Sequence, residues 1–222
     1  MCVLHTPEEM ERKNLRKLRS LLREVFPMTV TRNNTRVIQA AEGKLKESLS
    51  DAERASLLSQ IGWWYRNMEQ FQQARKSLEA SLALVPNDYN TVKQLLATVI
   101  NLRDKPATLE VMKQLLRLDL HNPTVFTDCF TYSRNTNMTC SDFLDLFETL
   151  KADHPDDELV LANCDFYIGN VLSSTDPKAA RERFVSAQRR FRKVLPRDHQ
   201  VFAALRSGLQ QLSVLLKKSA SS

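Results

Sequence analysis

The residues from Ala55 to Asp88 read ASLLSQIGWWYRNMEQFQQARKSLEASLALVPND. Apolar or small side chains recur there at helical spacing on two successive faces, separated by a break around residues 67–69. Those faces contain Leu58, Ile61, Gly62 and Tyr65, and then Phe71, Ala74, Leu78, Leu82 and Leu84. Pro86 ends the second face, because a proline ring clashes with the preceding turn and lacks an N–H. The stretch therefore predicts a pair of helices.

The spacing of small and aromatic residues in this pair resembles the tetratricopeptide repeat (TPR), a helix hairpin. The matching positions are Gly62, Tyr65, Phe71, Ala74 and Pro86. Leu58 stands where the family often has tryptophan, and Ser81 replaces a usual alanine. The resemblance implies that Gly62 and Ala74 let two antiparallel helices approach closely, with aromatic rings filling the space beside them.

One hairpin of this kind cannot bury its own apolar face, so neighbouring repeats are expected. Apolar spacing predicts further elements, increasingly degenerate, over 89–122, 123–156, 157–195 and 198–217. Before the clear repeat, Thr6-Pro7-Glu8-Glu9 predicts a capped helix start, and a second helix is expected over about 33–49. The predicted fold class is all-α: a right-handed α-solenoid of antiparallel, TPR-like helix pairs with about nine to eleven helices.

This fold predicts three parts of the chain. Residues 1–54 form N-terminal helices that pack on the solenoid, and residues 55–156 form three TPR-like repeats. Residues 157–222 form a degenerate repeat with a long basic helix and a C-terminal capping helix. The composition agrees with an all-α class, because four glycines and eight prolines are few for a β protein with many tight turns.

The cysteines and the apolar runs bear on the compartment. Cys2, Cys129, Cys140 and Cys164 show no metal-ligand or C-x-x-C spacing, which favours free thiols in a reducing environment. The first thirty residues lack the charged start and apolar middle of a signal peptide. No apolar run approaches the roughly 20 residues of a membrane span. We therefore expect a cytoplasmic protein without a membrane segment.

The sequence offers little for catalysis. The four histidines lie far apart, near predicted helix ends, and the four glycines cannot form a phosphate-cradling loop. Paired acids such as Asp156-Asp157 fall at helix starts, where they favour the helix dipole. We expect no enzyme activity, no cofactor and no metal site.

The resemblance also implies a peptide-binding groove lined by the first helix of each repeat. The groove residues carried over onto this sequence are Ser59, Trp63, Arg66, Asn67, Lys93, Asn101 and Arg134. A polar line with one tryptophan suits an extended peptide, whose backbone needs hydrogen-bond partners and whose side chains need an anchor. The leading hypothesis is an adaptor or scaffold that binds a segment of a partner protein. The alternative is a merely solvated face.

The charge is uneven along the chain. Residues 1–50 carry ten bases and six acids, residues 51–176 eleven and eighteen, and residues 177–222 eleven and two. A candidate nucleic-acid or acidic-partner patch consists of Arg189, Arg190, Arg192 and Lys193. RNA binding through it is the alternative function. Pairing with the acidic middle of the chain and self-association between chains are further readings of the same charges.

The adjacent tryptophans of the clear repeat must point about a hundred degrees apart on a helix. The repeat register predicts that Trp64 is largely buried against the helix at 33–49. The same register places Trp63 on the groove. The doubled tryptophan is thus predicted to supply one core residue and one anchor.

Overall fold

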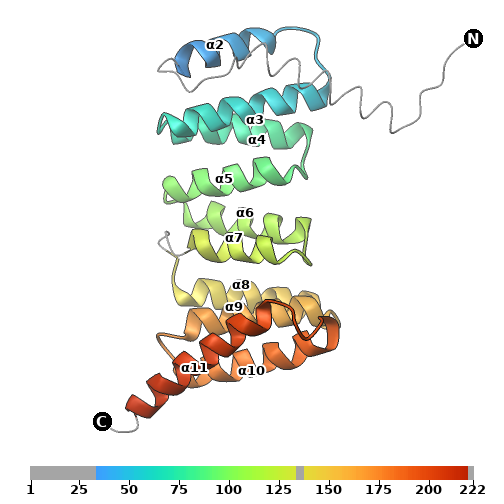
Figure 1. The fold of residues 1–222 in the computed structure, drawn as a ribbon. Coiled ribbons are helices and arrows are strands. Elements are labelled where there is room, and N and C mark those ends of the chain that lie inside the picture. The colour runs from blue at the N-terminus through green and yellow to red at the C-terminus, as the bar shows by residue number, and fades with distance from the viewer. Residues whose placement is uncertain (1–33, 134–137, 220–222) are drawn as a thin grey trace, which may run out of the picture. The chain divides into compact units, whose positions relative to one another are not determined.

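The computed structural model describes residues 34–133 and 138–219 (Figure 1). Within these residues it contains ten α-helices and no strand. The predicted all-α class and its antiparallel helix pairs are confirmed. The predicted helix start at residues 6–9 lies outside the described residues. The chain forms two compact units, Met1–Asp104 and Lys105–Ser222; the predicted division at residues 54 and 156 stays a prediction.

The first unit is built from consecutive helices that pack on their neighbours. Its helices are α2 (Asn34–Lys44), α3 (Asp51–Asn67), α4 (Phe71–Leu84) and α5 (Tyr89–Asn101). Helices α3 and α4 form the hairpin of the clear repeat, and α4 then packs on α5 (Figure 1). Both α2 and α5 also contact α3, so α3 is the central element of this unit.

Helix α3 begins at Asp51, ahead of the first apolar residue of the repeat, because Ser50 caps it. The Glu53 N–H donates to the Ser50 hydroxyl at 3.4 Å, and the Ser50 N–H donates to the Glu53 carboxylate at 2.9 Å. This reciprocal capping box satisfies two backbone donors that a helix start otherwise leaves unpaired. Asp88 caps α5 more simply, accepting from the Thr91 N–H at 2.9 Å.

The α3–α4 hairpin closes around the small residues that the sequence singled out. A Cβ added at Gly62 would lie 2.6 Å from Leu78 Cγ and 3.2 Å from the Ala74 carbonyl oxygen. Only glycine fits this approach without a shift. Ser81, where the tetratricopeptide pattern usually has alanine, is buried and donates its hydroxyl to the Ala55 carbonyl at 2.7 Å. The departure from the family pattern therefore adds a bond between the two helices.

The turns after α3 and α5 are the same structure one repeat apart. Glu69 has φ of 59° and Arg103 has φ of 56°, both in the left-handed region. The next N–H closes each turn, from Gln70 to the Tyr65 carbonyl at 2.9 Å and from Asp104 to the Val99 carbonyl at 3.1 Å. These bonds are typical of a Schellman C-cap, which usually has glycine at the left-handed position.

Glycine at either left-handed position should stabilise the protein. Glu69→Gly or Arg103→Gly is expected to raise the free energy of unfolding by about 0.5–1 kcal/mol, because glycine adopts positive φ without a Cβ clash. Urea titration followed by circular dichroism measures the change. Glu69→Ala is the matched control, since it removes the same carboxylate but keeps a Cβ. An equal gain from alanine would show that the charge, and not the backbone, is responsible.

The second unit has six described helices. They are α6 (Lys105–Leu118), α7 (Pro123–Ser133), α8 (Cys140–Asp153), α9 (Glu158–Leu172), α10 (Pro177–Val194) and α11 (Val201–Ser219). Helix α9 is central, packing on α8, α10 and α7, while α11 packs on α10. Asp176 accepts from the Ala179 N–H at 3.0 Å and Pro177 follows it, so this pair begins α10. No helix among residues 34–133 and 138–219 is both long and apolar enough to cross a membrane.

The α9–α10 hairpin uses the same close approach as the clear repeat. A Cβ at Gly169 would lie 2.6 Å from Phe184 Cδ1 and 3.3 Å from the Ala180 carbonyl oxygen. A Cβ at Gly208 of α11 would lie 2.8 Å from Cε2 of the same ring. Phe184 is 2% exposed and is held between two glycines. The close approach at a glycine thus recurs in the α9–α10 hairpin, although the sequence there does not follow the repeat spacing.

Candidate functional site

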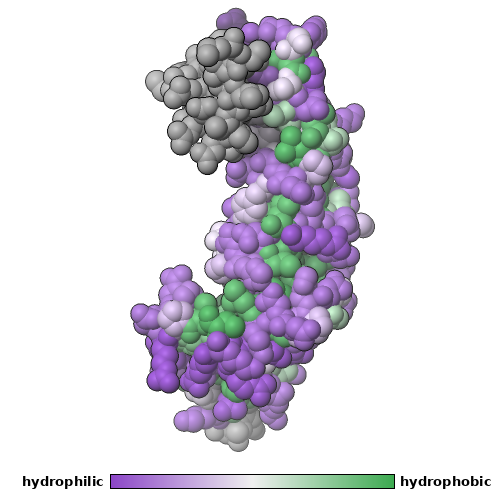
Figure 2. Space-filling model, turned by 90° about the vertical axis from the view of Figure 1, so that its right-hand side faces the viewer, coloured by the Kyte–Doolittle hydropathy of each residue, from purple (hydrophilic) through white to green (hydrophobic). Residues whose placement is uncertain are grey.

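The predicted groove residues of the first unit lie on two helices in contact. We define the α3–α5 surface as Trp63, Arg66 and Asn67 of α3 with Lys93 and Asn101 of α5. Helical spacing puts the three α3 residues on one face, and the two α5 residues are likewise two turns apart on one face. Asn67 and Asn101 are exposed, and the other three are partly exposed. The face of the molecule in Figure 2 is mostly hydrophilic, with hydrophobic residues gathered in smaller areas.

Ser59 does not belong to this accessible surface. It is 8% exposed, and its hydroxyl accepts a hydrogen bond from Thr91 Oγ1 at 2.8 Å and from Gln94 Nε2 at 3.4 Å. Both partners belong to α5, so Ser59 joins the two helices beneath the surface. The repeat position alone does not predict the burial of Ser59, because that burial depends on how closely α5 packs against α3. Arg134 lies outside the described residues.

The two tryptophans form an edge-to-face pair. Their ring centroids are 4.7 Å apart and their planes meet at 78°. Trp64 packs against the cluster of Ile38, Ala41, Leu57 and Ile61, which joins α2 to α3. The predicted contact of Trp64 with the preceding helix is therefore present, although Trp64 is partly rather than fully buried. Trp63 is also partly buried, with its ring fixed against that of Trp64.

The predicted basic patch divides into side chains with and side chains without an ion pair to another described residue. Arg190 Nη1 lies 2.7 Å from Glu158, and Lys193 Nζ lies 2.5 Å from the same carboxylate. Arg189 and Arg192 are exposed on α10. The hypothesis that the basic residues pair with the acidic middle of the chain therefore holds for two of the four residues, Arg190 and Lys193. Two of its four cations are already engaged in ion pairs.

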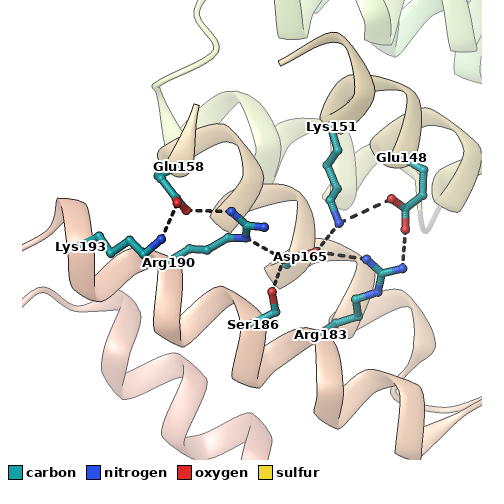
Figure 3. A network of polar contacts seen from close by, with 8 residues as sticks. All are labelled: Glu148, Lys151, Glu158, Asp165, Arg183, Ser186, Arg190 and Lys193. Carbon is teal, nitrogen blue, oxygen red and sulfur yellow. Dashed lines mark hydrogen bonds and ion pairs between the residues drawn. The ribbon is translucent and has the colours of Figure 1, made fainter. Parts of the chain in front are cut away.

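Behind this pair lies a buried polar network centred on Asp165 of α9 (Figure 3). Asp165 is 1% exposed and accepts from Lys151 Nζ at 2.6 Å and from the Ser186 hydroxyl at 2.6 Å. Two guanidinium groups also pair with it, Arg183 Nη1 at 3.2 Å and Arg190 Nε at 3.4 Å. The network ties α9 to α8 and α10. Its one sequence signal is a lone acid in the apolar stretch of residues 159–172.

The surroundings of Asp165 keep it ionised. Burial acts to raise its pKa, but hydrogen bonds from Lys151 and Ser186, the Lys151 charge and the Arg183 bond outweigh it, so the pKa lies below its ordinary value. Each carboxylate and each cation of this network takes part in at least one ion pair within the protein, and Asp165 itself is almost fully buried. A buried carboxylate surrounded by cations is typical of a structural ion cluster.

Two cysteines of the described chain have buried thiols. Burial raises the pKa of the Cys129 thiol to about 12, and that of Cys164 to about 12. Thiols with such pKa values are poor nucleophiles at neutral pH. In the described part of the chain, no group of three or more His, Cys, Asp and Glu side chains could hold a metal ion.

Comparison with known proteins gives limited similarity. No protein-family model matches the chain, and no curated protein matches it. Among solved structures, a MamA crystal structure has 12% identity and a TM-score of 0.46, covering 86% of this chain and 98% of its own. MamA 41-end from Desulfovibrio magneticus RS-1 has 13% identity and a TM-score of 0.47, covering 83% and 97%. The MamA RS-1 ArsTM double mutant has 13% identity and a TM-score of 0.46, covering 82% and 94%. Values this low do not establish a shared family.

Proposed function

We propose that this protein is a non-enzymatic interaction module that binds an extended segment of a partner protein on the α3–α5 surface. The observation that carries the proposal is Trp63, a partly exposed indole held by Trp64 and flanked by Arg66 and Asn67. Tryptophan and arginine are the residue types that contribute most to protein interfaces. Free Cys129, Cys140 and Cys164 support a reducing compartment such as the cytoplasm.

The surface is ordered before any partner arrives. The Thr91–Ser59 hydrogen bond fixes α5 against α3, and the Asn101 amide donates to the Ala97 carbonyl at 2.8 Å. Asn101 is exposed, so its side-chain oxygen can accept a hydrogen bond from a peptide N–H. Because the helices already hold these groups, binding would cost little ordering entropy in the protein.

A double substitution tests this proposal. Trp63→Ala with Arg66→Ala should lower affinity for a protein partner at least about tenfold, because truncating an interface hot spot costs about 2 kcal/mol or more. Affinity capture from nuclease-treated extract, quantified by mass spectrometry, identifies the partner, and titration calorimetry measures the loss.

The matched control is Gln72→Ala with Lys76→Ala, two exposed residues of α4 in the same unit. Capture that survives the control substitution but not the Trp63 substitution supports the proposal. Equal capture by all three proteins, with unchanged circular dichroism, would contradict it.

A further inference from the structure

A hollow lies in the second unit, where α10 ends and α11 begins. It is a cavity of about 520 Å³. Its lining residues are Gln188, Arg192, Arg197, Phe202 and Arg206. Phe202 is 5% exposed and forms an apolar wall, while the three arginines are exposed. Arginines from α10, from the connecting segment and from α11 thus line one hollow.

The arginines of α10 differ in how their charge is compensated. Arg183 and Arg190, which face α9, pair with Glu148, Glu158 and Asp165 (Figure 3). Among the described residues, none of the three cavity arginines has a carboxylate within ion-pair distance. The region offers little compensation, since residues 177–222 contain eleven bases and only two acids, Glu182 and Asp198. Neither acid lines the cavity.

We propose that this cavity binds a phosphate monoester. Guanidinium is planar and presents a fork of N–H donors that matches phosphate oxygens, and such charge-assisted bonds are roughly twice as strong as neutral ones. Three such forks around one hollow suit a dianion with three free oxygens better than a single carboxylate. The volume falls in the range of small-ligand pockets, so the group that carries the phosphate also has space. The Gln188 amide adds a further hydrogen-bonding group.

The same surroundings disfavour a nucleic-acid strand. Strand-binding surfaces need a continuous basic track with aromatic rings exposed for base stacking. Here Glu158 pairs with both Arg190 and Lys193, so an acid interrupts the basic side of α10. The nearby aromatic rings, Phe191 and Phe202, are 1% and 5% exposed. A discrete pocket fits one phosphate group and not a chain of them.

Isothermal titration calorimetry of the full chain tests the proposal with phenyl phosphate and with a phosphoserine pentapeptide. The test variant is Arg197→Gln with Arg206→Gln. The control is Arg181→Gln with Arg189→Gln, which removes the same charge from exposed positions of α10 outside the cavity. We expect saturable binding that weakens at least tenfold in the test variant and stays within twofold of the unmodified protein in the control.

The outcomes separate the possibilities. Tighter binding of the pentapeptide assigns the phosphate to a protein side chain, and tighter binding of phenyl phosphate assigns it to a small molecule; both support the site. Absence of saturable binding at 150 mM salt would overturn it, as would equal weakening in both variants. A poly(U) oligonucleotide that binds more tightly than either probe and weakens equally in both variants would indicate a diffuse RNA surface. None of these measurements involves the α3–α5 surface, so the two proposals fail independently.

Discussion

Replacing Asp165 with asparagine should lower the free energy of unfolding by about 3 kcal/mol. The asparagine leaves Lys151, Arg183 and Arg190 without the buried carboxylate that they surround. Removing one partner of a buried ion pair destabilises a protein by far more than the intact pair stabilises it, because the remaining charge stays desolvated. The three cations keep some solvent access, which places the expected loss at the lower end of the range for buried pairs. Denaturant titration measures the loss, and hydrogen exchange of α9 and α10 amides localises it.

The same carboxylate predicts an acid dependence. The pKa of Asp165 is lowered in the folded protein, so its ionised form stabilises the fold. That contribution is complete above the ordinary pKa of 3.8 and is lost as the pH falls through the lower, folded-state value. The stability of the unmodified protein should therefore approach that of the Asp165→Asn variant in acid. Glu158→Gln, at the solvent edge of the same network, should cost less. An Asp165→Asn variant as stable as the parent at pH 7 would show that the network is energetically neutral.

The second large effect is expected for Phe184→Ala, at about 3–5 kcal/mol. The ring is 2% exposed and touches α9 through Gly169 and α11 through Gly208, so its removal leaves a cavity between three helices. Neither glycine has a side chain that can move into the space. Thermal unfolding followed by circular dichroism gives the change.

A double-mutant cycle tests whether the glycine contact is the reason. Gly169→Ala alone should destabilise the protein by about 1–3 kcal/mol, because the new methyl group would lie 2.6 Å from the Phe184 ring. In a Phe184→Leu background the smaller side chain gives way, so the added cost should shrink by more than half. Strict additivity of the two substitutions would contradict the proposed packing.

The fold was largely predictable because its signals are local. Gly62, Ala74 and Pro86 defined one hairpin, and the apolar period located the helices on both sides of it. The Gly169–Ala180 contact was not predicted from the sequence. These residues are one position closer in sequence than Gly62 and Ala74, so they do not match the repeat spacing. The left-handed turn residues were not predicted either, because Glu69 and Arg103 are not glycines and nothing in their residue type indicates a turn.

The candidate surfaces were less predictable because they depend on contacts between distant residues. Repeat position identified Trp63 and Arg66 but could not show that Ser59 is buried by Thr91. Charge counting identified the basic end of the chain. It could not show which arginines form ion pairs with acids of other helices, as Arg190 does, or which arginines line a cavity, as Arg192 does.

Site-specific photocrosslinking tests the central claim most directly. Trp63 is replaced with p-benzoylphenylalanine, which keeps an aromatic ring on the α3–α5 surface, and Lys76 on α4 is replaced in a control protein. We predict that irradiation in cells links position 63, and not position 76, to a discrete partner protein, and that Arg66→Ala weakens this adduct. The same adducts from both positions, or none from position 63 in a correctly folded protein, would contradict the account.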